Sequence, residues 1–137
     1  MNLDYKKEII KYRLERSRET YEEALLMQRE NHWNTCANRL YYACFYAVTA
    51  LLQKHDLSSG KHSGVKALFN QHFIKTNIIC KEKGKLYNRL FDARQEGDYI
   101  DFVYYSSEDV TPWIKEVDIF INTISNIIED NNSSFAI

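Results

Sequence analysis

The stretch RQEGDY, Arg94 to Tyr99, places a cation, a carboxylate and a phenol close together in the chain. Arg94 and Asp98 are four positions apart, a spacing at which helical side chains of opposite charge can touch. Gly97 lies between them, and glycine commonly follows the last residue of a helix. An arginine placed in this way can hold a phosphate through two parallel hydrogen bonds, or it can form an ion pair with Asp98 and do nothing further.

Histidine is the other side chain that could act near neutral pH. His62, in GKHSG, precedes a predicted helix, where it either anchors the loop or contacts a ligand near backbone N–H groups; we favour the anchor. His72 lies on an apolar stripe, which is typical of a core residue. The sequence contains no glycine-rich phosphate loop, paired cysteine ligands, His-Glu zinc motif or serine elbow. We therefore expect neither a metal nor a cofactor.

The composition is that of a globular protein, with 45% hydrophobic and 27% charged residues among 137. A formal net charge of -1 argues against nucleic-acid binding through an overall positive field, but it leaves room for a local basic pocket. The three cysteines lack metal-ligand spacing, and Cys36 and Cys44 fall on an apolar helix, so we expect reduced thiols. Without a signal region or an apolar stretch long enough to span a bilayer, we expect a cytoplasmic protein with no membrane contact.

Apolar residues recur every three or four positions in five segments, which predicts five amphipathic helices. The segments are residues 4–31, 33–54, 64–76, 82–96 and 111–130. The second is apolar around most of its circumference and should be the central helix. Its less apolar stripe includes Arg39 and Tyr42, residue types that suit an interface or a pocket wall.

The segment from Tyr99 to Ser107 is aromatic and β-branched, but no second strand is available to pair with it. We expect an extended loop held down by its aromatic side chains. Thr111 and Pro112 then carry the signature of a helix start, although the helix could extend back to Glu108. The pattern predicts an all-α, five-helix up-and-down bundle, forming one domain over residues 1–130 with a flexible tail at 131–137.

Three stretches carry a resemblance to a known family. They are NRLYYACFYAVTALL at residues 38–52, KHSGVKALFNQHF at 61–73 and RQEGDY at 94–99. In order and spacing they resemble the HEPN-domain family, over about residues 14–128, and most closely its small stand-alone bacterial and archaeal members. The resemblance implies a helical bundle and a homodimer in which the motif helices face each other. Many members are metal-independent endoribonucleases, and several are toxins paired with a small nucleotidyltransferase.

The resemblance also implies an active site in which an arginine is followed, four to six residues later, by a histidine at the end of a helix. Arg94 matches that arginine, and Tyr99 matches a tyrosine that often follows. Asp98 stands close to where the histidine would be. An ionised carboxylate accepts a proton weakly, cannot donate one, and neutralises a neighbouring arginine. This departure argues against standard nuclease chemistry.

Three functions remain open. In the first, which we rank highest, Arg94 joins Arg39 and Tyr42 across a dimer groove to bind the phosphate of a nucleotide or RNA, as a HEPN component paired with a nucleotidyltransferase. In the second, Arg94 and Asp98 are catalytic residues of a metal-independent endoribonuclease, or His62 supplies the base. In the third, the protein is a non-catalytic interaction subunit. The candidate ligand-binding residues are Arg39, Tyr42, His62, Arg94 and Tyr99.

Overall fold

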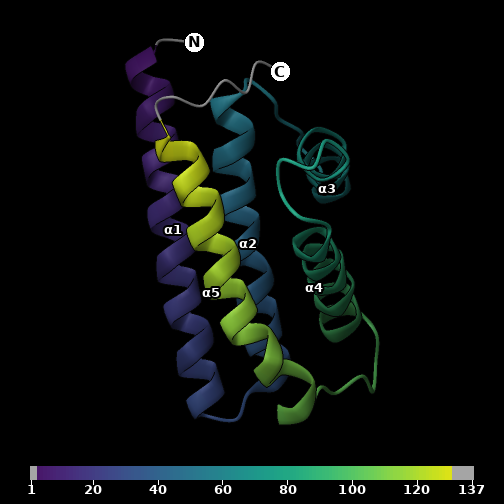
Figure 1. The fold of residues 1–137 in the computed structure, drawn as a ribbon. Helices are drawn as coiled ribbons and strands as arrows, with labels where there is room; N and C mark the ends of the chain where they lie inside the picture. Colours follow the sequence, from purple (N-terminus) through teal and green to yellow (C-terminus); the bar gives the residue numbers. More distant parts are fainter. Residues whose placement is uncertain (1–2, 131–137) are drawn as a thin grey trace.

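Two long antiparallel helices run side by side along the molecule (Figure 1). The computed structural model describes residues 3–130; Met1, Asn2 and the predicted tail at 131–137 lie outside the described residues. Helix α1 spans Leu3–Arg29 and helix α2 spans Trp33–Lys54. Small side chains let the pair approach closely, and the buried hydroxyl of Ser17 donates a 2.6 Å hydrogen bond to the carbonyl oxygen of Ala43.

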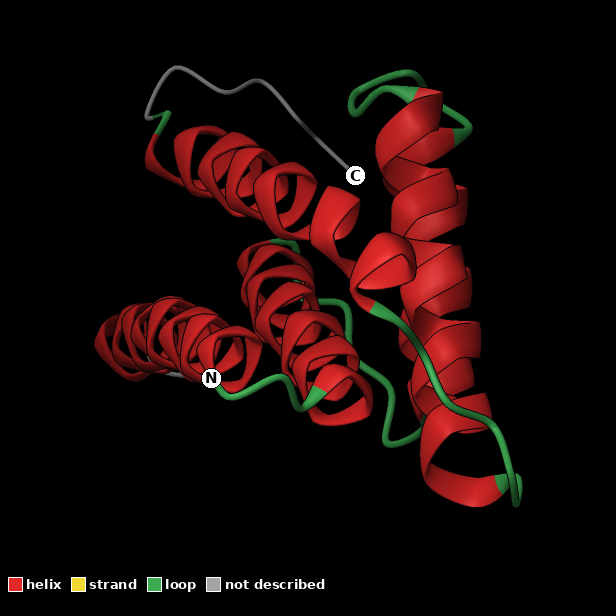
Figure 2. Ribbon diagram, turned by 90° about the horizontal axis from the view of Figure 1, so that it is seen from below, coloured by secondary structure: helices red, strands yellow, loops and turns green. Residues whose placement is uncertain are grey.

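The remaining elements flank α2 on two sides. After a loop come α3, His62–Phe69, the π-helical turn η1, Asn70–Ile74, and α4, Lys81–Tyr99. Helix α5, Ser107–Glu129, returns along α1 and α2, while α3 and α4 lie on the other side of α2 (Figures 1 and 2). Between residues 3 and 130 there is no strand, which confirms the all-α prediction. None of the described helices is long and apolar enough to cross a membrane.

Helix α2 is the centre of the core, as its sequence predicts. Twelve of its residues are buried, including both cysteines, and large aromatic side chains from the other helices surround it. Cys36 and Cys44 are free thiols, and burial raises the pKa of Cys36 to about 11. Cys80 is also free but exposed. The two buried cysteines therefore behave as small hydrophobic residues.

Helix α5 starts at Ser107, close to the earlier start at Glu108 that the sequence left open and not at the Thr111 signal. Ser106, not Thr111, is the N-cap: its hydroxyl accepts a hydrogen bond from the backbone N–H of Asp109, and the carboxylate of Asp109 accepts one from the backbone N–H of Ser106. This reciprocal capping box satisfies two backbone N–H groups and puts the N-cap five residues before Thr111. Pro112 consequently lies inside the helix.

Two helix ends near the predicted site also differ. Helix α4 continues through Gly97 to Tyr99, so the prediction that Gly97 ends the helix is wrong, and no glycine in residues 3–130 has a positive φ. Helix α3 begins at His62, whereas the sequence predicted a start at Gly64. Both corrections bear on the site, because they place Asp98 and His62 on helices rather than in loops.

The loop between α4 and α5 is held by one polar side chain of α2. The amide of Asn34 donates to the carbonyl oxygen of Val103 at 2.8 Å and accepts from the N–H of Tyr105 at 2.7 Å. Tyr105 packs against a tryptophan of α5, but Phe102 is 91% and Tyr104 82% exposed. The expectation that aromatic side chains hold the loop down is therefore wrong for these two residues.

Asn34→Ala is expected to loosen this loop. The substitution removes both hydrogen bonds, and at a net value of about 0.5–1.5 kcal/mol each the free energy of unfolding should fall by about 1–3 kcal/mol. Urea unfolding measures the loss, and hydrogen exchange should show faster exchange of backbone amides in residues 100–106. Asn126→Ala, an exposed asparagine on α5, is the control. Unchanged exchange in the loop would contradict the role of Asn34.

Candidate functional site

Arg94 reaches from the last turns of α4 onto the tyrosines of α2. Its Nη2 donates a 2.9 Å hydrogen bond to the hydroxyl of Tyr42 and a 3.2 Å bond to that of Tyr99. The guanidinium carbon lies 5.7, 5.5 and 5.3 Å from the ring centroids of Tyr41, Tyr42 and Tyr99. Only 13% of the Arg94 side chain is exposed. Aromatic faces and neutral hydroxyls therefore surround most of this cation, an arrangement that stabilises its charge.

Asp98 forms the predicted ion pair with Arg94, but the pair is long. The distance from Arg94 Nε to Asp98 Oδ2 is 3.9 Å, beyond hydrogen-bond range. The same carboxylate oxygen accepts a 2.7 Å hydrogen bond from the side-chain amide of Asn38 on α2. Within residues 3–130, the buried Nε of Arg94 has no hydrogen-bond acceptor. The Arg94 cation is thus only partly neutralised by its carboxylate neighbour.

His62 comes to the same place from the first turn of α3. Its Nδ1 is 2.7 Å from the hydroxyl of Tyr41, and its ring stacks on that of Phe45 at a centroid distance of 4.4 Å. Burial, and secondly the positive charge of Arg94, lower the pKa of His62 from its ordinary value. The imidazole is therefore mainly neutral at neutral pH, and the positive charge of Arg94 disfavours its protonation.

Arg39 lies over the ring of Tyr42, with its guanidinium carbon 5.3 Å from the ring centroid. Unlike Arg94, it has a close carboxylate partner, the side chain of Glu23 on α1 at 3.1 Å. It also donates two hydrogen bonds to the amide oxygen of Asn38, at 3.0 and 2.8 Å. Arg39 is consequently better neutralised than Arg94.

All six predicted site residues belong to one connected cluster within a single chain. The residues are Arg39, Tyr42, His62, Arg94, Asp98 and Tyr99. Sequence reasoning expected Arg39 and Tyr42 to meet Arg94 across a groove between two chains, but α2 and α4 of the same chain bring them together. The cluster is therefore formed without a second subunit.

Two further members of the cluster were missed. Asn38 connects Arg39 with Asp98, and Tyr41 bonds His62 while its ring lies beneath Arg94. Burial raises the pKa of Tyr41 to about 12, so its hydroxyl stays protonated. The available signal was helical spacing, because Asn38 is three and four positions before Tyr41 and Tyr42 and so shares their side of α2.

The cluster can do two things chemically. A largely buried guanidinium whose Nε–H lacks an acceptor can bind an anion, most favourably a phosphate or carboxylate. A neutral imidazole beside it can accept a proton. No group of three or more His, Cys, Asp or Glu side chains in residues 3–130 is arranged to hold a metal ion.

Comparison with known proteins gives a consistent result. The family model of the HEPN domain matches residues 10–128. A UPF0332 protein of Thermotoga maritima is 43% identical over 128 residues, which cover 93% of this chain and 97% of that protein. A Methanocaldococcus jannaschii protein named "Putative toxin MJ0142" is 30% identical over 132 residues, covering 96% of this chain and 89% of the relative. The all-helical chain therefore belongs to the HEPN-domain family.

Proposed function

We propose that this HEPN protein binds the phosphate of an RNA or a nucleotide at Arg94. One observation carries the proposal: the guanidinium is largely buried, its nearest carboxylate is 3.9 Å from Nε, and that buried Nε lacks an acceptor within the described part of the chain. A buried charge is costly unless an anion pairs with it closely. Since Nε has almost no accessible surface, a phosphate oxygen would become its acceptor once the exposed Tyr99 side chain, which covers the guanidinium, moves aside.

The neighbouring residues receive distinct roles in this proposal. Tyr42 and Tyr99 hold the guanidinium by its Nη2 and so fix its orientation. Arg39 adds a second cation on the Tyr42 ring, although Glu23 already neutralises much of it. The Tyr99 side chain is exposed enough to contact a bound nucleotide as well.

For partners, we infer a cytoplasmic homodimer that acts as the HEPN component of a toxin–antitoxin-like pair with a nucleotidyltransferase. The name of the archaeal relative supports a toxin-related role. Two free, buried thiols fit a reducing compartment. Co-expression with a small nucleotidyltransferase, followed by size-exclusion chromatography, tests the pairing. Two separate peaks would contradict it.

Binding itself is tested with a short fluorescein-labelled single-stranded RNA, by fluorescence anisotropy in EDTA. We expect saturable binding that weakens as salt rises, because a phosphate contact releases counterions. AMP and inorganic phosphate should compete, AMP more strongly if the base also contributes. Absence of binding in a folded preparation, or binding that neither phosphate compound competes with, would contradict the proposal.

A second candidate function is metal-independent endoribonuclease activity. The observation in its favour is that α3 places a histidine against Tyr41, whose ring Arg94 also contacts, although the RQEGDY motif lacks a histidine. A neutral His62 could take the proton of a ribose 2′-hydroxyl while Arg94 stabilises charge on the phosphate. Asp98 is the alternative base, but the amide of Asn38 already occupies one of its oxygens.

If the protein cleaves RNA in EDTA, we expect a rate that is steady at neutral pH and falls in acid, at a pH below the ordinary histidine value of about 6.5, because the base must be unprotonated and the pKa of His62 is lowered. His62→Gln should lower the rate about 100-fold or more, and Asp98→Asn much less. The lowered pKa of His62 also means that its protonation destabilises the fold below about pH 6.5, so circular dichroism should accompany each rate. Equal losses of cleavage rate in His62→Gln and Asp98→Asn, or an unchanged rate in His62→Gln, would contradict this mechanism.

A further inference from the structure

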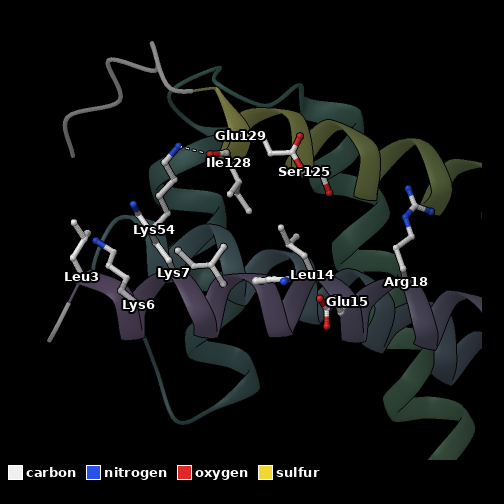
Figure 3. A pocket seen from close by; sticks show the side chains of 12 residues that line it. Leu3, Lys6, Lys7, Leu14, Glu15, Arg18, Lys54, Ser125, Ile128 and Glu129 are labelled. Atoms are coloured by element: carbon white, nitrogen blue, oxygen red, sulfur yellow. Dashed lines mark hydrogen bonds between the residues drawn. The ribbon is translucent and has the colours of Figure 1, made fainter.

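A groove of about 710 Å³ lies at the other end of α2 from the Arg94 cluster. Its two walls are the N-terminal half of α1 and the C-terminal part of α5, and Lys54 at the end of α2 lies between them (Figure 3). Neither Arg94 nor any residue of its cluster lines the groove. Whatever the groove binds is therefore separate from the proposed phosphate site.

The groove combines an apolar surface with a basic rim. Its apolar residues are Leu3, Ile10, Leu14 and Ile128. Five cationic residues line it, and only two acidic ones: Lys6, Lys7, Lys11, Arg18 and Lys54 against Glu15 and Glu129. This local excess of positive charge stands out in a chain whose formal net charge is -1.

Only part of this positive charge is used inside the molecule. Lys6 pairs with Asp56, Arg18 pairs with an aspartate of α5, and Lys54 donates to carbonyl oxygens at the end of α5. Lys7 and Lys11, one turn apart on α1, have no ion-pair or hydrogen-bond partner within residues 3–130. The rim therefore presents two adjacent ammonium groups that can attract an anionic partner.

The α1 wall is also poorly covered. No side chain from Leu3 to Arg16 is buried; the first buried residue of the helix is Ser17. An isolated helix of that length is marginal in water and is normally stabilised by packing of its apolar face. Leu3, Ile10 and Leu14 are spaced by seven and four residues, which is the pattern of a helix–helix seam.

We propose that this groove binds an amphipathic α-helix of a partner protein, with acidic residues flanking the apolar face of that helix. The α1 residues lining the groove run from Leu3 to Arg18, about 22 Å of helix. The α5 wall is shorter and consists of Ser125, Ile128 and Glu129. A groove this long on its α1 side suits a helix packed along α1 rather than a compact ligand. The unpaired lysines at positions 7 and 11 favour a partner helix with acidic residues beside its apolar face.

A panel of labelled synthetic helical peptides of about 16 residues tests the proposal. All carry the same leucine face; one set has glutamate on the flanks, the matched set has lysine, and scrambled versions lose the apolar face. With the full-length protein, we expect glutamate peptides to bind roughly tenfold or more tightly than lysine peptides, and scrambled ones not to bind. Lys7→Glu with Lys11→Glu should reverse the preference.

The control is Lys75→Glu with Lys81→Glu, two exposed lysines outside the groove, which should leave the preference unchanged. Arg94→Ala should also leave it unchanged, so failure here is distinct from failure of phosphate binding. Three results would overturn the proposal: no glutamate peptide binds, the groove variant retains the original preference, or dodecanoate binds in the groove and the peptides do not. A second copy of this chain found in the groove by cross-linking would overturn it too.

Discussion

Arg94→Ala is expected to weaken binding of the labelled RNA about 100-fold or more. A bidentate pair between guanidinium and phosphate is among the strongest hydrogen-bonded contacts in proteins, and each bond to a charged group contributes about 1.5–3 kcal/mol. Losing two such bonds removes at least about 3 kcal/mol, which corresponds to more than a hundredfold in affinity. Anisotropy titration in EDTA measures the loss directly.

The same substitution should leave the fold intact. Arg94 donates to the hydroxyls of Tyr42 and Tyr99, and we expect its removal to lower the free energy of unfolding by about 1–3 kcal/mol. Arg94→Lys should bind RNA more tightly than Arg94→Ala but less tightly than the wild type. Lysine keeps the positive charge, but it lacks the planar guanidinium that donates two parallel hydrogen bonds to a phosphate. Arg29→Ala, an exposed arginine at the end of α1, is the matched control. If the control weakens binding equally, the site is not at Arg94.

Cys44→Asp should abolish folding. Cys44 is completely buried in α2, and burial raises the pKa of its thiol well above the ordinary value, which shows how strongly this position disfavours a negative charge. An aspartate there would be a buried, unpaired carboxylate. The expected loss exceeds about 4 kcal/mol, a large part of the total stability of about 5–15 kcal/mol typical of a domain. Circular dichroism and size-exclusion chromatography report the loss.

Two substitutions separate charge from volume at this position. Cys44→Ala removes only the thiol and should cost about 1 kcal/mol, the central value for single mutations. Cys80→Asp places the same carboxylate at an exposed cysteine and should be nearly neutral. Cooperative unfolding of Cys44→Asp at a midpoint close to that of the wild type would contradict the central position of α2.

Helix α2 shows what periodicity can predict. Its observed bounds, Trp33–Lys54, are those that the apolar pattern indicated, and its central position follows from being apolar on most sides. The apolar periodicity of a helix is summed over many residues, so the local preference of one residue does not change the prediction. The family resemblance agreed with the all-α fold that the periodicity predicts, and the match over residues 10–128 confirms the resemblance.

Helix ends depend on a few local contacts, and these were predicted less well. Thr111 followed by Pro112 is a good start signal, but the pairing of Ser106 with Asp109 caps the helix five residues earlier. Gly97 is a good stop signal, yet α4 continues past it and Arg94 bonds Tyr99 in the same final turns. In both places a side-chain contact outweighed the local preference.

The contacts within the candidate site were predictable only where the residues are close in sequence. Arg94, Asp98 and Tyr99 share the end of one helix, so their proximity follows from helical spacing. His62 joins the cluster through Tyr41 and Phe45 only because α3 packs against α2, and short-range sequence spacing does not reveal this packing. The hydrogen bond from Asn38 to Asp98 likewise forms only because α2 and α4 pack together.

The most direct test of phosphate binding at Arg94 is the ¹H–¹⁵N NMR signal of its Nε–H group, assigned by its absence in Arg94→Lys. The signal is recorded while single-stranded RNA is added in EDTA. We expect it to move progressively and to saturate at the RNA concentrations that saturate the anisotropy, because a phosphate oxygen provides the acceptor that Nε lacks within residues 3–130. RNA binding that leaves this signal unmoved while backbone signals elsewhere shift would contradict the account.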